Sequence, residues 1–172
     1  LYRLVAAQHA GRRELGSTDL DPSLADFLAG FDHPGVAGEL FAIFEGVRVD
    51  AGIARRYRGL GADLAAVVAE LEHGGRRLSG TLPHLVHVLR EARLPELARR
   101  IPALTARLGA DDATVADTAE ITRAVYAEMM RGEHGTLLAS AMHGPADDED
   151  LAQLAEDARF YLDGGDTLAD GE

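Results

Sequence analysis

The stretch that decides the fold runs over Leu40–Leu60 and reads LFAIFEGVRVDAGIARRYRGL. Apolar residues recur along it at helical spacing: Leu40, Phe41, Ile43, Phe44, Val47, Ala51 and Ala54. This period predicts one long helix over about Val36–Arg58. Only Gly46 and Gly52 weaken that helix, each by up to about 1 kcal/mol relative to Ala. A glycine kept inside a helix allows another helix to approach closely.

Helical segments of the same kind make up the rest of the chain. Breaks separate them at Gly16–Thr18, Asp32–Gly35, Gly59–Gly61 and Gly74–Gly75. We expect the helices over residues 1–14, 21–30, 36–58, 62–73, 81–93, 95–108, 111–131 and 144–162, with a short segment at 137–142. No stretch shows the two-residue period of a strand. The sequence therefore predicts an all-α fold, an irregular bundle of about eight helices.

Several helix ends carry capping signals. Asp21 stands just before a proline and is expected to cap its helix, as are Thr81 and either Asp111 or Asp112. Pro102 falls inside the helix expected over 95–108. Because proline has no N–H to donate and crowds the preceding turn, Pro102 must start, kink or split that helix.

The domain organisation follows from these breaks. We expect residues 1–163 to form one helical domain, or two lobes that meet near residues 74–80, and residues 164–172 to form an acidic linker or tail. The first residue is Leu1 rather than methionine, and the last stretch is rich in Gly and Asp. We interpret both ends as cuts in a longer protein.

The composition narrows the classes of function. The 172 residues carry a formal net charge of −12, and an acidic surface repels phosphate backbones and anionic lipids. The absence of cysteine excludes disulfides, thiolate metal sites and cysteine nucleophiles. No apolar run is long enough to span a bilayer, and no signal segment opens the chain. We expect a cytoplasmic protein that binds neither nucleic acid nor membrane and carries no cofactor.

Three side chains form a weak candidate metal site. His84 and His87 are three residues apart, and Glu91 follows four residues later, so that all three lie roughly on one face of a helix. Such a face can bind a divalent metal. The alternative is a polar helix face that carries two solvated histidines.

The sequence does not match the patterns of common catalysts. Ser140 lies in no nucleophile elbow, and no phosphate loop or dinucleotide fingerprint is present. The acidic run Asp147–Asp150 lacks the glycine and the terminal glutamate of a calcium loop, and a helix N-terminus explains it better. We therefore expect no catalytic residue and no enzymatic activity.

Charged residues interrupt the apolar helix that opened this section. Glu45 and Arg48 are three residues apart, which is close enough to pair on the helix surface. Asp50 and Arg55 lie on other faces and must find partners elsewhere. Such charges often pair between packed helices, and breaking a partly buried pair costs a few kcal/mol.

The same stretch carries a family resemblance. A Phe-Glu pair, then Arg-Val-Asp, then Tyr-x-Gly-Leu resembles the helical region ahead of the von Willebrand factor A domain in NorD and CbbO proteins, with a related pattern in the cobaltochelatase CobT subunit. The matching residues are Phe44, Glu45, Arg48, Val49, Asp50, Tyr57, Gly59 and Leu60. The opening LYRLVAAQHAGRRELGS is also similar, and the resemblance covers roughly residues 1–64.

The resemblance implies a partner protein rather than a catalyst. Family members work with MoxR-type AAA+ ATPases, which remodel a target such as nitric oxide reductase or Rubisco, and the matching residues are expected to hold the helices that present the partner surface. Two positions depart from the pattern: Gly46 replaces a commonly acidic residue and Arg58 a common proline. The metal-ion-dependent adhesion motif is absent from these residues, so that domain is missing or lies beyond the cut.

Two other functions stay open beside the adaptor. The chain can be a stand-alone helical scaffold or regulatory domain without an ATPase partner. It can also be a metal-binding helical protein that uses the face of His84, His87 and Glu91.

Overall fold

The computed structural model describes residues 9–20, 23–60, 62, 66 and 80–131. These residues contain seven helices and no strand, and 77% of them are helical, which confirms the predicted all-α class. Outside the described residues lie nearly all of the helix expected at 62–73, the lobe boundary near 74–80, the segment at 137–142, the helix at 144–162 and the tail at 164–172.

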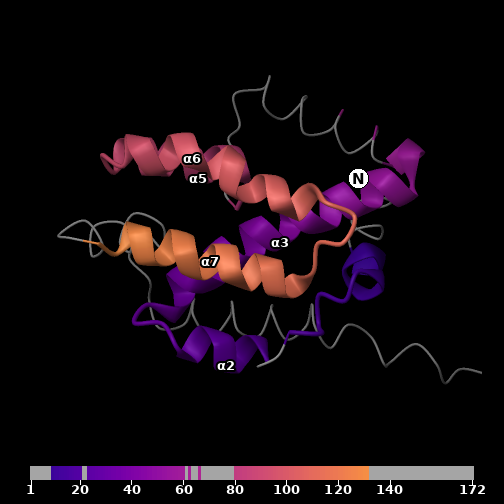
Figure 1. Cartoon of the computed structure of the whole chain (residues 1–172), viewed down its shortest axis with the longest axis horizontal. Coiled ribbons are helices and arrows are strands. Elements are labelled where there is room, and N and C mark those ends of the chain that lie inside the picture. Colours follow the sequence, from indigo (N-terminus) through magenta and orange to yellow (C-terminus); the bar gives the residue numbers. More distant parts are fainter. Residues whose placement is uncertain (1–8, 21–22, 61, 63–65, 67–79, 132–172) are drawn as a thin grey trace, which may run out of the picture.

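A long central helix organises the described part. The helices are α2 (Leu24–Ala29), α3 (Pro34–Arg56), α5 (Leu82–Glu91), α6 (Pro95–Thr105) and α7 (Val115–Met129), with a 3-10 helix η1 (Ala106–Gly109) that continues α6. Residues 9–14 are also helical, and a further helix begins at residue 58. Figure 1 shows α3 between the α5–α6 pair and α7, and α3 touches α2, α5, α7 and η1.

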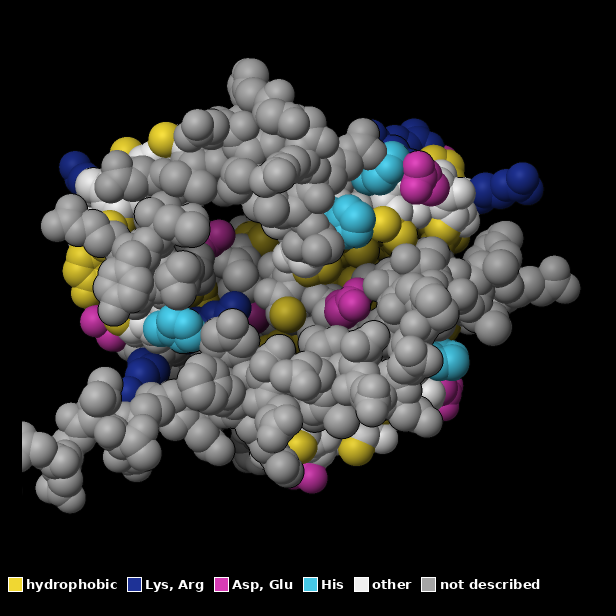
Figure 2. Space-filling view, turned by 180° about the vertical axis from the view of Figure 1, so that it is seen from behind, with side chains coloured by type: hydrophobic (Ala, Val, Ile, Leu, Met, Phe, Trp, Pro, Cys, Tyr) yellow, Lys and Arg dark blue, Asp and Glu magenta, His cyan; other side chains and the backbone are white. Residues whose placement is uncertain are grey.

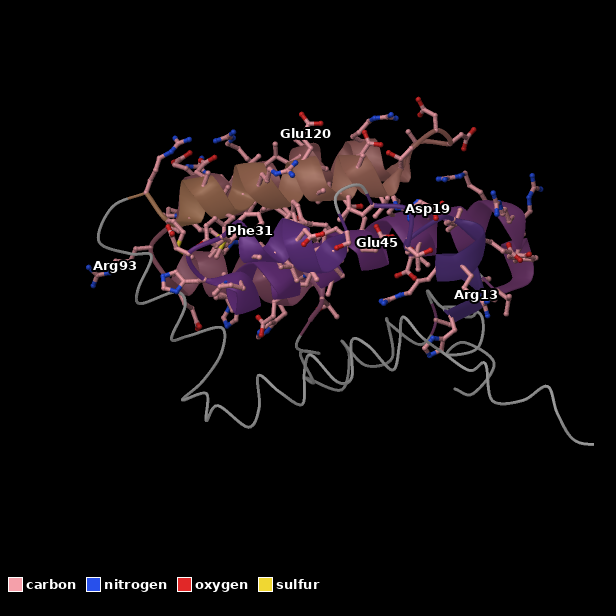
Figure 3. All side chains as sticks on the ribbon, turned by 90° about the horizontal axis from the view of Figure 1, so that it is seen from below. Arg13, Asp19, Phe31, Glu45, Arg93 and Glu120 are labelled. Carbon is pink, nitrogen blue, oxygen red and sulfur yellow. The ribbon has the colours of Figure 1, made fainter. Side chains whose placement is uncertain are left out.

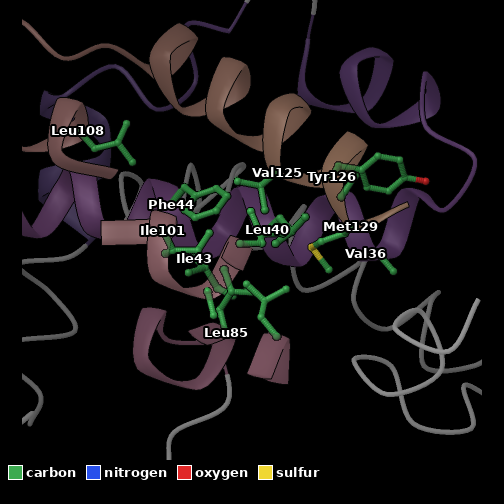
Figure 4. Close-up of a cluster of buried hydrophobic side chains, with 14 residues drawn as sticks. Val36, Leu40, Ile43, Phe44, Leu85, Ile101, Leu108, Val125, Tyr126 and Met129 are labelled. Atoms are coloured by element: carbon green, nitrogen blue, oxygen red, sulfur yellow. The ribbon is translucent and has the colours of Figure 1, made fainter. Parts of the chain in front are cut away.

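The main core forms where these helices meet around α3. Its buried side chains are Val36, Ala37, Leu40, Ile43 and Phe44 of α3, Leu85 and Leu89 of α5, Leu97, Ala98 and Ile101 of α6, Leu108 of η1, and Val125, Tyr126 and Met129 of α7 (Figure 4). Burying one large aliphatic or aromatic side chain contributes about 1.5–3 kcal/mol. The apolar residues that opened the sequence analysis therefore form the surface against which α2, α5, η1 and α7 pack.

An aromatic cluster attaches α2 to this core. The rings of Phe27 and Phe31 lie 5.0 Å apart, edge to face, and Phe31 meets Tyr126 of α7 at 4.7 Å in the same way. The hydroxyl of Tyr126 also accepts a hydrogen bond from the backbone N–H of His33 (2.9 Å). The short helix α2 is thus fixed by ring contacts to the turn and helix beside it.

Both ends of α3 lie two residues before the predicted ends. The helix begins at Pro34 rather than Val36, because proline at the first helical position loses no needed N–H and its fixed φ suits the helix. It ends at Arg56, and Tyr57 leaves the helical region with φ −129°. The break expected at Gly59–Gly61 therefore falls at Tyr57, and residues 58–60 already belong to the next helix.

The helix α7 begins with a different cap from the predicted one. Thr114 is the N-cap, and its backbone N–H donates to the carboxylate of Asp117 (2.7 Å) in a capping box. The prediction of Asp111 or Asp112 was wrong, because a capping box needs an acidic residue three positions after the cap, as Asp117 is after Thr114. Asp112 instead forms an ion pair with Arg107 (2.5 Å).

Two other helix starts can be compared with the sequence. Thr81 caps α5 as predicted, and its hydroxyl accepts the backbone N–H of His84 (3.4 Å). At α2 the cap is Ser23, whose hydroxyl accepts the N–H of Asp26 (3.4 Å), while Asp21 lies outside the described residues.

Pro102 neither starts nor splits α6. The helix runs through this exposed proline to Thr105 and then tightens into η1. The hydroxyl of Thr105 donates to the carbonyl of Ile101 (3.0 Å), which supports the last turn before the change to 3-10 geometry.

The two glycines inside α3 have different surroundings. A Cβ at Gly52 would stand 2.5 Å from Leu15 Cδ1, whereas one at Gly46 would have no heavy atom within 4 Å. Gly11, on the helix at residues 9–14, faces α3 in the same close way, because its Cβ would stand 2.8 Å from Ile53. Close approach of the segment at residues 9–15 thus explains why position 52 of α3 is glycine, but it does not explain the glycine at position 46.

This contrast predicts opposite outcomes for two matched substitutions. Gly46→Ala gains helix propensity without a clash and is expected to stabilise the protein by up to about 1 kcal/mol. Gly52→Ala gains the same propensity but must displace Leu15, so we expect it to be about 1–3 kcal/mol less stable than Gly46→Ala. Denaturant unfolding of both variants measures the difference, and equal stabilities would contradict the packing of residues 9–15 on α3.

Candidate functional site

The residues that carry the family resemblance divide into two groups. Phe44, Glu45, Arg48 and Val49 are buried, Asp50 and Leu60 are half-buried, and Tyr57 and Gly59 are exposed. The first part of the motif therefore faces the interior from α3, and the second part lies beyond the end of that helix. The buried part contains two charges, and these define the candidate site.

Glu45 and Arg48 form a two-pronged ion pair inside the protein. Arg48 Nε donates to Glu45 Oε2 (2.9 Å), and Arg48 Nη2 donates to Glu45 Oε1 (2.6 Å). Each residue is only 2% exposed. The spacing along the sequence predicted the pair, and residues 15–17 and α7 bury it because they cover this face of α3.

The remaining donors of Arg48 reach two other segments. Nη1 donates to the backbone carbonyl of Leu15 (3.0 Å) and, more weakly, to that of Ala113 (3.4 Å). Nη2 donates to the hydroxyl of Ser17 (3.3 Å). The planar guanidinium, with its five N–H donors, can serve all these acceptors at once, which the single ammonium of a lysine does not match.

The carboxylate of Glu45 extends the network to α7. Thr118 Oγ1 donates to Glu45 Oε2 (2.7 Å), and Thr118 is fully buried. The network thus links four segments: residues 15–17, α3, the turn at Ala113 and α7. In Figure 3 Glu45 lies between the ribbons of α3 and α7.

The pKa of Glu45 reports the balance of this site. Burial raises the pKa of the carboxyl, but hydrogen bonds from Arg48, Ser17 and Thr118, together with the charge of Arg48, outweigh burial and hold the pKa below its ordinary value. Glu45 is therefore charged at neutral pH. Both carboxylate oxygens already accept hydrogen bonds, so the pair is arranged to join helices rather than to act on a substrate.

The exposed end of the motif also contacts the helix at residues 9–14. The Tyr57 hydroxyl donates to Glu14 (3.1 Å), and Arg56 pairs with the same carboxylate (3.4 Å). The hydrogen bond to Glu14 and the negative charge of that residue raise the pKa of Tyr57. Tyr57 remains 44% exposed, and it is the one large apolar side chain among the described residues that faces solvent to this extent.

Arg55 finds its partners in the turn before α7. Its Nε pairs with Asp111 (2.8 Å), and its Nη1 donates to the carbonyl of Gly109 (2.6 Å). This meets the expectation that Arg55 pairs away from its own helix. Asp50 also has an interaction partner.

The candidate metal residues do not converge. His87 Nε2 lies 3.1 Å from Glu91 Oε1, whereas His84 Nδ1 is buried and has no hydrogen-bond partner among the described residues. Among the described residues, no group of three or more His, Asp or Glu side chains is placed to hold a metal ion. The helix face that was singled out in the sequence therefore carries a contact between His87 and Glu91 beside a separate histidine.

The sequence did not reveal the other members of the network. Ser17 falls within the break expected at Gly16–Thr18, and Thr118 lies within the helix expected over residues 111–131. A hydroxyl on an otherwise apolar helix face indicates a hydrogen bond inside the protein, because a buried polar group needs a partner. The carbonyls of Leu15 and Ala113 leave no trace in the sequence, since any residue type supplies a carbonyl.

The burial of the pair predicts a large cost for breaking it. Arg48→Ala or Glu45→Ala leaves an unpaired charge inside the protein, and we expect each to destabilise the fold by about 3–5 kcal/mol. The matched control is Glu120→Ala on the exposed side of α7, expected to change stability by less than about 0.5 kcal/mol. Chemical denaturation measures all three, and unchanged stability of the first two would overturn the structural role of the pair.

The lowered pKa of Glu45 predicts a specific acid sensitivity. A carboxyl whose pKa is lower in the folded than in the unfolded state stabilises the fold above its unfolded pKa of about 4.3, and this contribution is lost as the pH falls through the folded value. Glu45→Gln removes that titration. The free energy of unfolding of the Glu45→Gln variant should therefore depend less on pH below about 4 than that of the original chain. Parallel pH profiles would contradict the expected shift.

Comparisons of the chain with protein-family models, with curated proteins and with solved structures find no match. In the part of the chain that the structure describes, no helix combines the length and the apolar character needed to cross a membrane.

Proposed function

We propose that this chain is a non-enzymatic interaction domain, an adaptor that works in the cytoplasm with a MoxR-type AAA+ ATPase and with the target that the ATPase remodels. The target class implied by the resemblance is a metalloenzyme or a Rubisco-like complex. The chain contributes a rigid helical surface, and the ATPase contributes the chemical work.

One observation carries this proposal. The two buried charged residues of the motif that resembles NorD and CbbO proteins, Glu45 and Arg48, bind each other and three neighbouring segments. Residues with this placement keep helices in a fixed arrangement. A fixed arrangement of helices is what an adaptor needs to present the same surface to a motor and to its target.

The exposed end of the motif gives the proposal a contact point. Tyr57 follows α3 directly and keeps 44% of its surface open to solvent. Tyrosine is enriched at protein interfaces, since its ring supplies apolar area and its hydroxyl a hydrogen bond. We place the partner surface around Tyr57 and the following residues 58–60.

A binding assay tests the proposal. The chain, and separately the product of the complete open reading frame that encodes it, is mixed with the MoxR-type ATPase of the same organism, and both complex formation and ATP hydrolysis are measured. We expect a stable complex or a changed rate of hydrolysis. If neither form binds the ATPase nor changes its rate, the adaptor function is wrong and a stand-alone scaffold takes its place.

Two variants make the assay specific. Tyr57→Ala should weaken binding at least fivefold, which is a loss of about 1 kcal/mol of binding free energy. The melting temperature should stay close to the original value. Glu120→Ala, on the outward side of α7, is the matched control and should bind like the original chain. Equal binding of Tyr57→Ala and the control would remove the partner surface from this end of α3.

A further inference from the structure

Positive charge gathers where the helix at residues 9–14 meets the end of α3. Residues 9–15 and 51–60 together contain five arginines and a single acidic residue, Glu14, whereas the rest of the chain contains twelve arginines and 28 acidic residues. Hydrogen bonds from Arg56 and Tyr57 to Glu14 join the two segments, and Figure 1 places both at the same end of the molecule. A chain with a net charge of −12 therefore carries one locally basic surface at a defined place in the fold.

Three arginines of this surface can reach a partner. Arg13 and Arg58 are exposed, and neither forms an ion pair with another described residue. Arg56 lies 3.4 Å from Glu14, and both of these side chains are about half exposed. Because an exposed pair of this kind contributes little, the guanidinium of Arg56 can turn to another carboxylate at small cost. In Figure 2 basic side chains project at this end of the molecule, and Figure 3 labels Arg13 there.

The local structure does not account for the charge of Arg58. Tyr57 ends α3, and residue 58 is the first residue of the following helix. The peptide dipoles make the first turn of a helix electropositive, so a cation is unfavourable there unless an anion stands beside it. No carboxylate of the described residues forms an ion pair with Arg58. An anionic partner would supply the counter-charge that this position lacks.

Tyr57 gives the same surface an apolar centre. It stands between Arg56 and Arg58 in the sequence, it is 44% exposed, and its hydroxyl donates to Glu14 (3.1 Å). Because this hydrogen bond holds the side chain in place before binding, less conformational freedom is lost when a partner arrives. Tyrosine and arginine are among the residue types that most often carry the binding energy of an interface. The surface thus fits a segment that combines carboxylates with an apolar side chain.

A carboxylate suits these arginines better than the phosphate backbone of a nucleic acid. The whole chain carries a net charge of −12, which repels a polyanion with about one charge per 1.7 Å of helix axis. A short acidic segment carries far fewer charges, and each of its carboxylates can form a two-pronged hydrogen-bonded pair with a guanidinium. The local basic charge is therefore matched to a peptide rather than to a nucleic acid.

We propose that the Tyr57 surface, formed by Arg13, Arg56, Tyr57 and Arg58, binds an acidic segment of a partner protein. Carboxylates of the segment pair with Arg56 and Arg58, and an apolar side chain of the segment packs on the ring of Tyr57. This rests on the proposed function, which places the partner surface at this end of α3, and it adds the chemistry of the segment that binds there. Because the charges are exposed, salt should weaken the binding strongly.

A synthetic peptide tests the surface in the full chain. The blocked peptide Glu-Leu-Glu-Phe-Glu-Leu-Glu is added to isotope-labelled protein at an ionic strength of about 0.02 M, and salt is then raised to about 0.5 M. The amide signals of residues 12–14 and 56–60 should shift, and the added salt should reverse the shift. The same peptide with Gln in place of every Glu should bind at least about tenfold more weakly. Unmoved signals, or equal binding of the two peptides, would overturn the proposal.

Two charge reversals with the same change in net charge locate the binding. Arg56→Glu with Arg58→Glu should weaken binding of the acidic peptide at least about tenfold. Arg90→Glu with Arg93→Glu, at the opposite end of the molecule in Figure 3, should bind it like the original chain. Arg58→Gln breaks no ion pair with a described residue, so it keeps the fold and should by itself weaken binding about threefold. Equal losses in the two double variants would show a response to net charge alone and would contradict a localised surface.

Other occupants of the surface give different results in the same experiment. A single-stranded DNA oligonucleotide that shifts these signals at a lower concentration than the acidic peptide would show that the surface binds phosphates. Signals that move with protein concentration before any peptide is added would show a second copy of the chain. Signals that move as far with salt alone, at every protein concentration, would show acidic residues of the same chain. Each of these results would overturn the partner segment.

The ATPase assay separates the acidic segment from the adaptor function. If Arg56→Glu with Arg58→Glu loses both the ATPase and the peptide, both proposals are supported. If the ATPase binds this variant as tightly as the original chain, the adaptor function stands and the acidic segment is wrong. If the peptide binds as expected while the ATPase binds neither protein, the adaptor function is wrong and the surface serves another acidic partner.

Discussion

Glu45 and Arg48 carry opposite charges into the interior of a helical protein, where each charge would be costly without the other. Hydrogen bonds to both charged groups offset this cost. The guanidinium of Arg48 donates to the carboxylate of Glu45 and to the carbonyl of Leu15, and the carboxylate also accepts a hydrogen bond from the hydroxyl of Thr118. These bonds link residues 15–17, α3 and α7. Apolar packing around α3 supplies most of the driving force for folding, and the ion pair fixes which surfaces meet.

The helix at residues 9–14 packs closely against α3, as the hydrogen bond between Arg48 and the Leu15 carbonyl requires. The Leu15 carbonyl can reach Arg48 only if that helix lies close to α3, and the missing side chains of Gly11 and Gly52 allow that approach. The exposed residues after α3 depend on the same arrangement, because Tyr57 is bonded to Glu14 of this helix. The proposed partner surface is thus held in place by the buried network through a short chain of contacts.

The sequence predicted the helical class and the central helix because apolar periodicity reports directly on which face is buried. It missed the N-cap of α7 at Thr114, which forms a capping box with Asp117, and predicted Asp111 or Asp112 in its place. It also predicted the pair of Glu45 and Arg48 from their spacing, with charges partly buried between packed helices. The residues that complete the burial could not be predicted, because Leu15, Ser17 and Thr118 are distant in sequence and Leu15 contributes only a backbone carbonyl.

The most direct measurement is a double-mutant cycle on the central pair. Glu45→Ala, Arg48→Ala and the double variant are compared with the original chain by equilibrium denaturation at neutral pH. The double variant leaves no buried charge alone, so we predict that it loses at least about 2 kcal/mol less than the sum of the single losses. Additive losses would show that the two side chains act separately, and would contradict the account of α3 as a helix organised around one buried ion pair.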